Sequence, residues 1–394
     1  MGKEGLTPQT TEAAFRARLA TDSLVNFSVQ KEITETTSRL WACREKVAGE
    51  AVWVPAPVSG IFPDGKDAWA VKEAKEVEGQ FPYIFTPNID SFDKLLAVAA
   101  MGLGLNREGK RAALVTNFVM QQRSEREIID ESGNLHGIPG IEMALLEPVA
   151  ALLAKAFPRG LIQTDGHGLG FEYLANQYGL PMLTLTSMPK LINAVFNHNM
   201  IQSRRSVSVS GDVGGVPLMN MVAEYTRGYG LDIKAVYGEK RAVQVFNDWA
   251  KEQIRGAQIL FGDDIISSGK TLFKKVLHAA FEAGANNAVV FVPHADLVEL
   301  TLENLNSCPL PTVLVTADTF PVRPEVAEAV AGNQRLWREP VFGSVMKAAE
   351  MDMQNLLADV ITNPDTQAEL LRQTELAIFP PYVDRFRTAS DMLE

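Results

Sequence analysis

Short apolar runs alternate with amphipathic segments along most of the chain, and this alternation constrains the fold more than any other feature. The runs are rich in β-branched residues and too short for buried helices, so we expect strands at residues 82–85, 112–116, 161–164, 206–209, 233–236, 259–261, 288–292 and 313–315. The segments between them show helical spacing, at 91–102, 142–155, 216–226, 243–254 and 271–283. This pattern predicts an α/β protein with mostly parallel sheets.

The expected strands fall into two sets of similar size, before and after about residue 190. A chain of 394 residues is long enough for two or three domains. We therefore expect an N-terminal extension at 1–50, a first α/β domain at 51–190, a second at 191–335 and a helical C-terminal segment at 336–394.

Composition narrows the class of protein. The formal net charge of −11 argues against a nucleic-acid binder, which usually carries a basic face. The two cysteines, Cys43 and Cys308, lie far apart and exclude a disulfide scaffold. Neither a signal peptide nor an apolar run of membrane-spanning length is present, so we expect a cytoplasmic protein without membrane partners.

The segment 259–272 (ILFGDDIISSGKTL) carries the strongest chemical signal. A buried strand is followed by two acids, then by a loop of small residues, then by a helix. Hydroxyls, a close-approaching glycine and free backbone N–H groups suit a phosphate. Asp263 and Asp264 would repel that phosphate, so they should face ribose hydroxyls or a divalent cation. A P-loop is excluded, because Asp264 stands where its first glycine is required.

This segment resembles the phosphoribosyl-diphosphate (PRPP) motif of type I phosphoribosyltransferases and of the PRPP synthetases, the ribose-phosphate pyrophosphokinases. Four more segments resemble the synthetases in the same order along the chain, at 62–66 (FPDGK), 118–126 (FVMQQRSER), 161–171 (LIQTDGHGLGF) and 208–216 (SVSGDVGGV). Segment 315–321 looks like the family's last strand end, and 235–241 looks like its flexible catalytic loop.

The resemblance implies two tandem phosphoribosyltransferase-like domains with the active site at their interface. It implies the reaction of Mg-ATP with ribose 5-phosphate to give PRPP and AMP. The residues expected to bind ATP are Phe62, Asp64, Lys66, Arg123, Ser124, Arg126 and His167. Those expected to bind ribose 5-phosphate or PRPP are Asp212, Gly214, Gly215, Asp263, Asp264, Ser267, Ser268, Gly269, Lys270 and Thr271.

The same resemblance assigns catalysis to Lys240, Arg241 and His167, and Mg²⁺ binding to His167, Asp212 and Asp165. It also implies a homo-oligomer, a dimer or a hexamer. The sequence departs from the family at Lys66, Ser124 and Glu239, which replace an acid, a glutamine and the loop lysine. Two alternatives therefore stay open: a non-catalytic regulatory relative, and a phosphoribosyltransferase that consumes PRPP.

Overall fold

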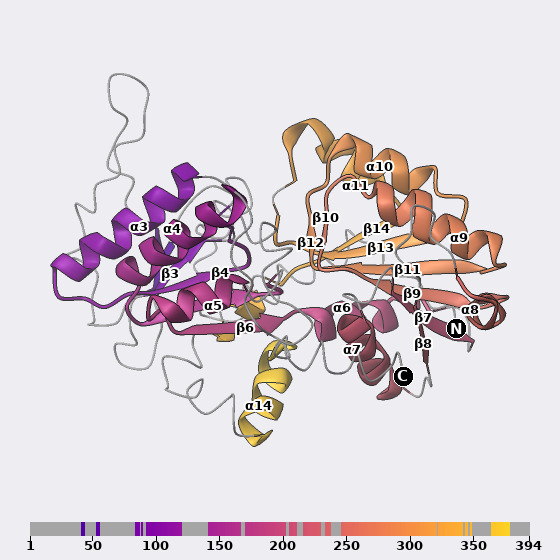
Figure 1. Ribbon diagram of the computed structural model, residues 1–394, viewed down its shortest axis with the longest axis horizontal. Coiled ribbons are helices and arrows are strands. Elements are labelled where there is room, and N and C mark those ends of the chain that lie inside the picture. Colours follow the sequence, from indigo (N-terminus) through magenta and orange to yellow (C-terminus); the bar gives the residue numbers. More distant parts are fainter. Residues whose placement is uncertain are drawn as a thin grey trace, which may run out of the picture.

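The computed structural model (Figure 1) describes residues 41–43, 53–55, 83–86, 88–89, 92–119, 141–166, 170–201, 205–210, 216–229, 233–237, 246–320, 322–341, 343–345, 347–348 and 364–378. Within them, two large sheets lie side by side and helices cover their faces. The protein is therefore a mixed α/β protein with parallel sheets, as the sequence predicts.

The first sheet, counted over the described residues, has seven strands in the order β15-β6-β5-β4-β3-β1-β2. The pairs from β3 to β6 are parallel, whereas β1 and β15 pair antiparallel with their neighbours. The bounds are β1 (Trp41–Cys43), β2 (Trp53–Pro55), β3 (Tyr83–Thr86), β4 (Ala113–Thr116), β5 (Gly160–Thr164), β6 (Met182–Thr186) and β15 (Ala377–Ile378).

The second sheet has six parallel strands among the described residues, in the order β14-β13-β11-β9-β7-β8. They are β7 (Ser206–Ser210), β8 (Lys234–Tyr237), β9 (Gln258–Gly262), β11 (Asn287–Val292), β13 (Thr312–Ala317) and β14 (Leu336–Glu339). All of β9 is buried, as expected for a central strand covered on both faces. A separate parallel pair, β10 (Ile265–Ile266) and β12 (His294–Ala295), stands beyond β9 and β11.

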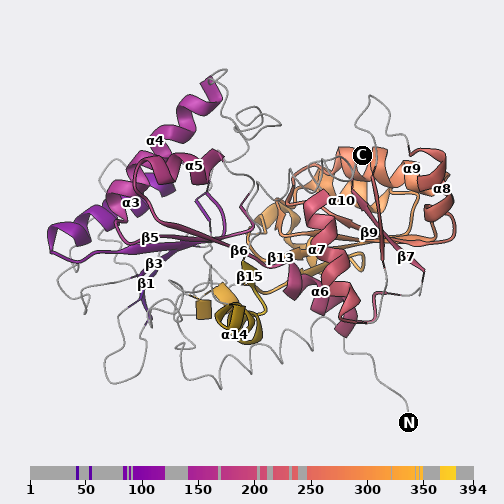
Figure 2. The same ribbon diagram turned by 60° about the horizontal axis from the view of Figure 1, so that its bottom comes forward.

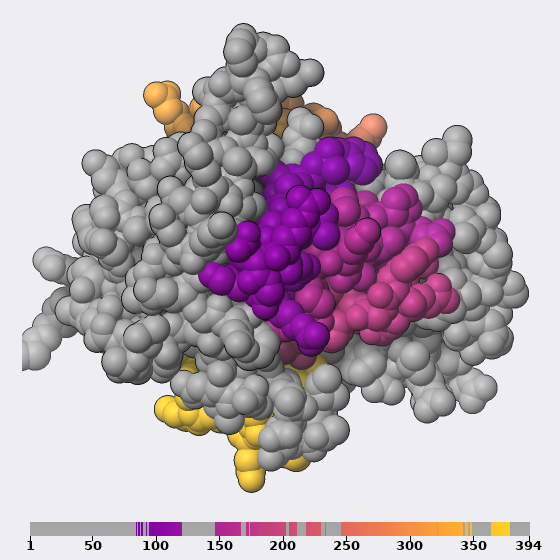
Figure 3. Space-filling view, turned by 90° about the vertical axis from the view of Figure 1, so that its left-hand side faces the viewer, coloured from indigo at the N-terminus to yellow at the C-terminus, as the bar shows by residue number. Residues whose placement is uncertain are grey.

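Each sheet has its own helical layer on one face (Figure 2). The helices α3 (Phe92–Arg107), α4 (Ile141–Ala156) and α5 (Gly170–Gln177) pack on the first sheet around one apolar core. The second sheet is covered by α8 (Asp248–Ile254), a π-helical turn (Leu272–Val276) continued by α9 (Leu277–Glu282), α10 (Glu299–Asn306) and α11 (Ala327–Gly332). Figure 3 looks onto this helical layer of the first sheet, where the indigo surface of α3 adjoins the magenta surface of α4 and α5.

The opposite faces of both sheets share a single apolar core. It is built around α6 (Met188–Asn197), α7 (Val216–Arg227) and α14 (Pro364–Thr374). Val115 and Leu185 enter this core from the first sheet, and Phe291 and Val315 enter it from the second. The expected boundary near residue 190 lies inside α6, so the division into two domains stays a prediction.

All eight predicted apolar runs contain strands, and each predicted helix overlaps a helix in the structure. The C-terminal segment expected to be helical holds α14, but also β14 in the second sheet and β15 on β6. Cys308 is a buried free thiol. In the described part of the chain, no helix combines the length and apolarity needed to cross a bilayer.

Candidate functional site

The carboxyl ends of the two sheets meet at His294, in β12. Its Nε2 lies 2.9 Å from the carbonyl oxygen of Asp165 and 3.2 Å from that of Thr164, at the end of β5. Its backbone N–H donates to the carbonyl of Asp264 at 3.0 Å, next to the end of β9. One fully buried residue, through its side chain and its backbone N–H, thus joins the loop after β5 to the loop after β9.

The surroundings of His294 place a hydrogen on Nε2. Both acceptors at Nε2 are carbonyl oxygens, so Nε2 carries a hydrogen. Burial lowers the pKa of the imidazole, and the nearby Asp165 opposes this effect. The hydroxyl of Thr319 lies 2.9 Å from Nδ1 and donates to the carbonyl oxygen of Pro293 at 2.8 Å. The rings of Phe118 and Phe320 pack beside the imidazole, with centroids 5.4 Å and 5.9 Å from its own.

Asp165 follows β5 in a left-handed conformation, with a φ of 51°, and is 1% exposed. Its carboxylate accepts hydrogen bonds from the hydroxyls of Thr186 at 2.7 Å and Ser187 at 2.6 Å. The N–H of Ser187 reaches both oxygens at 3.1 Å. Burial raises the pKa of Asp165, while His294 and these donors hold it down. Three donors thus make four contacts with this carboxylate.

The loop expected to bind phosphate follows β9 and runs from Asp263 to Thr271. Asp263 is exposed and its carboxylate accepts the N–H of Asp264 at 3.0 Å, which closes a tight local turn. Gly269 has a φ of 66°, and a Cβ there would lie 2.5 Å from the ring of Phe273. Only glycine fits this position, because both the backbone and the space exclude a side chain.

The small side chains of this loop lie at or near the surface. Ser267, Ser268 and Gly269 are half-buried, and Lys270 and Thr271 are exposed. The hydroxyl of Ser268 accepts the N–H of Lys270 at 3.4 Å. The loop therefore presents small polar groups at the carboxyl edge of the second sheet, where ligands of open α/β sheets bind.

The structure brings together only part of the predicted site. Asp165 lies on one side of His294 and the loop from Asp263 to Thr271 on the other. The other predicted residues lie outside the described residues: Phe62, Asp64, Lys66, Arg123, Ser124, Arg126, His167, Asp212, Gly214, Gly215, Lys240 and Arg241. Their roles stay predictions, as does metal binding by Asp165. Among the described residues, no cluster of three or more His, Cys, Asp or Glu side chains could hold a metal ion.

Sequence reasoning missed His294 and Thr319, and also Thr301 and Asn304 of α10, which contact the loop after β9. His294 comes two residues after a buried strand, where a polar side chain stands at a sheet's carboxyl edge, and this position was the available signal. Thr301 and Asn304 had no such signal, since they lie mid-helix and more than 30 residues from their partners.

The two sheets and their carboxyl-edge loops define the class of protein, an α/β protein with a phosphoribosyltransferase-like fold. No protein-family model matches the chain, and no curated protein matches it in sequence. Among solved structures, the crystal structure of phosphoribosylpyrophosphate synthetase from Mycobacterium smegmatis is similar, with a TM-score of 0.56 and 16% sequence identity. The match covers 79% of this chain and 90% of that one. At this identity the likeness shows the fold.

Proposed function

We propose that this chain is a ribose-phosphate diphosphokinase, which makes PRPP and AMP from ATP and ribose 5-phosphate. The observation that carries the proposal is the loop from Asp263 to Thr271, with its acid pair and small polar residues at the carboxyl end of β9. The carboxyl end of β5 lies on the other side of His294, which supports a site between the ends of the two sheets.

In this reaction, the 1-hydroxyl of ribose 5-phosphate attacks the β-phosphorus of ATP in line. A bond forms between O1 and the β-phosphorus, and the bond from that phosphorus to the oxygen bridging to the α-phosphate breaks, which releases AMP. Asp263 and Asp264 accept hydrogen bonds from the ribose hydroxyls, and the loop from Ser267 to Thr271 holds the 5-phosphate. Such chemistry depends mainly on positioning and charge neutralisation.

The residues on the ATP side are those that the sequence indicates. Arg123 and Arg126 bind phosphates, Phe62 stacks on the base, and Lys240 and Arg241 stabilise the charge that develops during transfer. Mg²⁺ enters bound to ATP, where it neutralises phosphate charge. His167, Asp212 and Asp165 would hold it, and the carboxylate of Asp165 also accepts hydrogen bonds from Thr186 and Ser187.

The test is to incubate the pure protein with Mg-ATP and ribose 5-phosphate and to measure AMP and PRPP. We expect AMP to form only when ribose 5-phosphate is present. The double variant Asp263→Asn, Asp264→Asn should lose about a hundredfold in rate, since two charge-assisted hydrogen bonds to the sugar are weakened. AMP formation no faster than that of a His167→Ala variant would refute the proposal.

One sequence observation favours a second candidate, a non-catalytic relative that binds the same ligands. Glu239 stands where the family's loop lysine is expected, with Lys240 one position later. A protein of this kind would bind ribose 5-phosphate yet form no PRPP, so a binding measurement beside the assay separates the two candidates.

A further inference from the structure

Two buried side chains of α10 hold the backbone of the loop after β9. The hydroxyl of Thr301 donates to the carbonyl oxygen of Ser267, and the amide of Asn304 donates to that of Ser268 at 2.7 Å. Thr301 is 0% exposed and Asn304 1% exposed, one helical turn apart on the same face of α10. Two consecutive peptide groups of the loop are therefore anchored from the protein interior.

This anchoring decides where the N–H groups of the loop point. A trans peptide is planar, so its C=O and its N–H point in opposite directions. Because the carbonyls of Ser267 and Ser268 point toward α10, the N–H groups of Ser268 and Gly269 point away from it. Within the described part of the chain, neither N–H donates to a backbone or side-chain acceptor. Two adjacent donors are thus aimed out of the loop.

The flanking carbonyls fix the rest of the loop. The N–H groups of His294, Asp296 and Phe273 donate to the carbonyls of Asp264, Ile266 and Gly269 at 3.0, 2.9 and 2.8 Å. Each of these bonds is made by backbone and survives a change of side chain. The carbonyls of Ser267 and Ser268 instead take their orientation from the side chains of Thr301 and Asn304.

We infer that Thr301 and Asn304 are positioning residues that turn the N–H groups of Ser268 and Gly269 toward the phosphate of a sugar phosphate. This inference rests on the proposed function and specifies how its phosphate site is built. The two residues act through the loop backbone and do not touch the ligand. An oriented pair of N–H groups attracts a phosphate dianion through its partial positive charges. Such a local site can bind an anion even though the net charge of the chain is −11.

The test compares Thr301→Val and Asn304→Leu, which keep the approximate volume of each side chain, with wild type. In each variant the freed peptide can rotate, so we expect the KM for ribose 5-phosphate to rise about tenfold. The KM for ATP should not change. With ribose in place of ribose 5-phosphate, kcat/KM should equal that of wild type, because no phosphate is present to lose its donors.

Two further variants separate positioning from folding. Thr301→Ser keeps the hydroxyl and should restore the KM for ribose 5-phosphate. Thr226→Val removes a buried hydroxyl that donates to the carbonyl of Val222 at 2.7 Å on α7, and should leave that KM unchanged at a similar loss of stability. An unchanged KM in Thr301→Val and Asn304→Leu, or equal increases for ATP and ribose 5-phosphate, would overturn the inference alone. A wild-type protein that binds no ribose 5-phosphate would overturn the proposed function together with it.

Discussion

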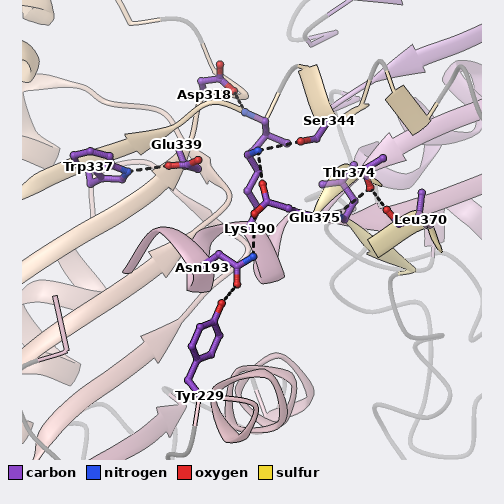
Figure 4. Close-up of polar contacts among 12 residues, drawn as sticks. Lys190, Asn193, Tyr229, Asp318, Trp337, Glu339, Ser344, Leu370, Thr374 and Glu375 are labelled. Atoms are coloured by element: carbon purple, nitrogen blue, oxygen red, sulfur yellow. Dashed lines mark hydrogen bonds and ion pairs between the residues drawn. The ribbon is translucent and has the colours of Figure 1, made fainter. Parts of the chain in front are cut away.

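Glu339, at the end of β14, is a carboxylate held in an unfavourable place. Burial raises its pKa above the ordinary value of 4.5, and the nearby acids Glu375 and Asp318 add to this effect. A hydrogen bond from Trp337 Nε1 at 3.0 Å and the charge of Lys190 oppose it. Figure 4 shows how these side chains converge between the second sheet and the C-terminal segment.

The raised pKa gives a prediction for the pH dependence of stability. Folding favours the protonated form of Glu339, so its stabilising contribution is complete below pH 4.5 and is lost as the pH rises through the higher folded value. Glu339→Gln keeps an acceptor for Trp337 and cannot ionise. We expect the variant to gain free energy of unfolding relative to wild type as the pH rises from 4.5 to 8, measured by denaturant titration.

The matched control is Glu369→Gln on α14. Hydrogen bonds from Arg372 and Gln373 hold the pKa of the half-buried Glu369 at about 2, so removing this carboxylate should bring no gain as the pH rises. A Glu339→Gln curve that runs parallel to wild type across this pH range would show that burial does not perturb Glu339.

At the scale of elements, the C-terminal segment is fastened by a few polar contacts. Helix α14 ends at Thr374, and Glu375 follows with a φ of 55°. The carboxylate of Glu375 accepts hydrogen bonds from Lys190 and from Asn193, both of α6, at 3.0 Å each (Figure 4). Strand β15, only two residues long, then pairs with β6. The short pairing therefore depends on the side chains that precede it.

We expect Glu375→Gln to loosen β15 and α14 while the two sheets stay folded. The substitution removes the ion pair with Lys190, whose side chain is only 11% exposed, and leaves a half-buried cation without its carboxylate. Hydrogen exchange should rise at Ala377 and Ile378. Glu369→Gln, a change of the same type on the same segment, should not raise it. Unchanged exchange in Glu375→Gln would assign the docking of this segment to its apolar contacts, Leu370 and Leu376.

The sequence predicts a strand less well when the polar side chains of that strand have their partners in other elements. The eight predicted runs are rich in apolar and β-branched residues, so their composition predicts burial. Strand β6, in which Thr184 and Thr186 alternate with apolar residues, was not predicted. The hydroxyl of Thr184 accepts a hydrogen bond from Gln163 of β5 at 3.0 Å. The hydroxyl of Thr186 donates to Asp165, in the loop after β5, at 2.7 Å. Such partners follow from the tertiary structure and leave no local trace.

The same reason limits prediction of the candidate site. The loop from Asp263 to Thr271 was recognisable because its acids, hydroxyls and glycine are contiguous. The contact of His294 with Asp165 joins residues 129 positions apart, and no pattern in the sequence links them. The sequence thus predicts the groups that would touch a ligand better than the groups that hold them in position.

At the scale of the whole molecule, the two sheets are joined on two sides. His294 links their carboxyl ends through hydrogen bonds, and the core around α6 links their faces through apolar packing. Leu191 of α6 is fully buried in this shared core with residues from both sheets. By contrast, Leu153 of α4 lies in the core of the first sheet alone, and Ile254 of α8 in that of the second.

This arrangement predicts that the stability of both sheets depends on Leu191. Leu191→Ala should cost about 2–5 kcal/mol, since it leaves a cavity between the sheets. Hydrogen exchange should then rise by similar factors in β5 of the first sheet and in β13 of the second. Leu153→Ala should raise exchange more in β5, and Ile254→Ala more in β13, because each cavity lies in the core of one sheet. If Leu191→Ala accelerated exchange in one sheet only, the shared core would not couple the two, and each would fold as an independent unit.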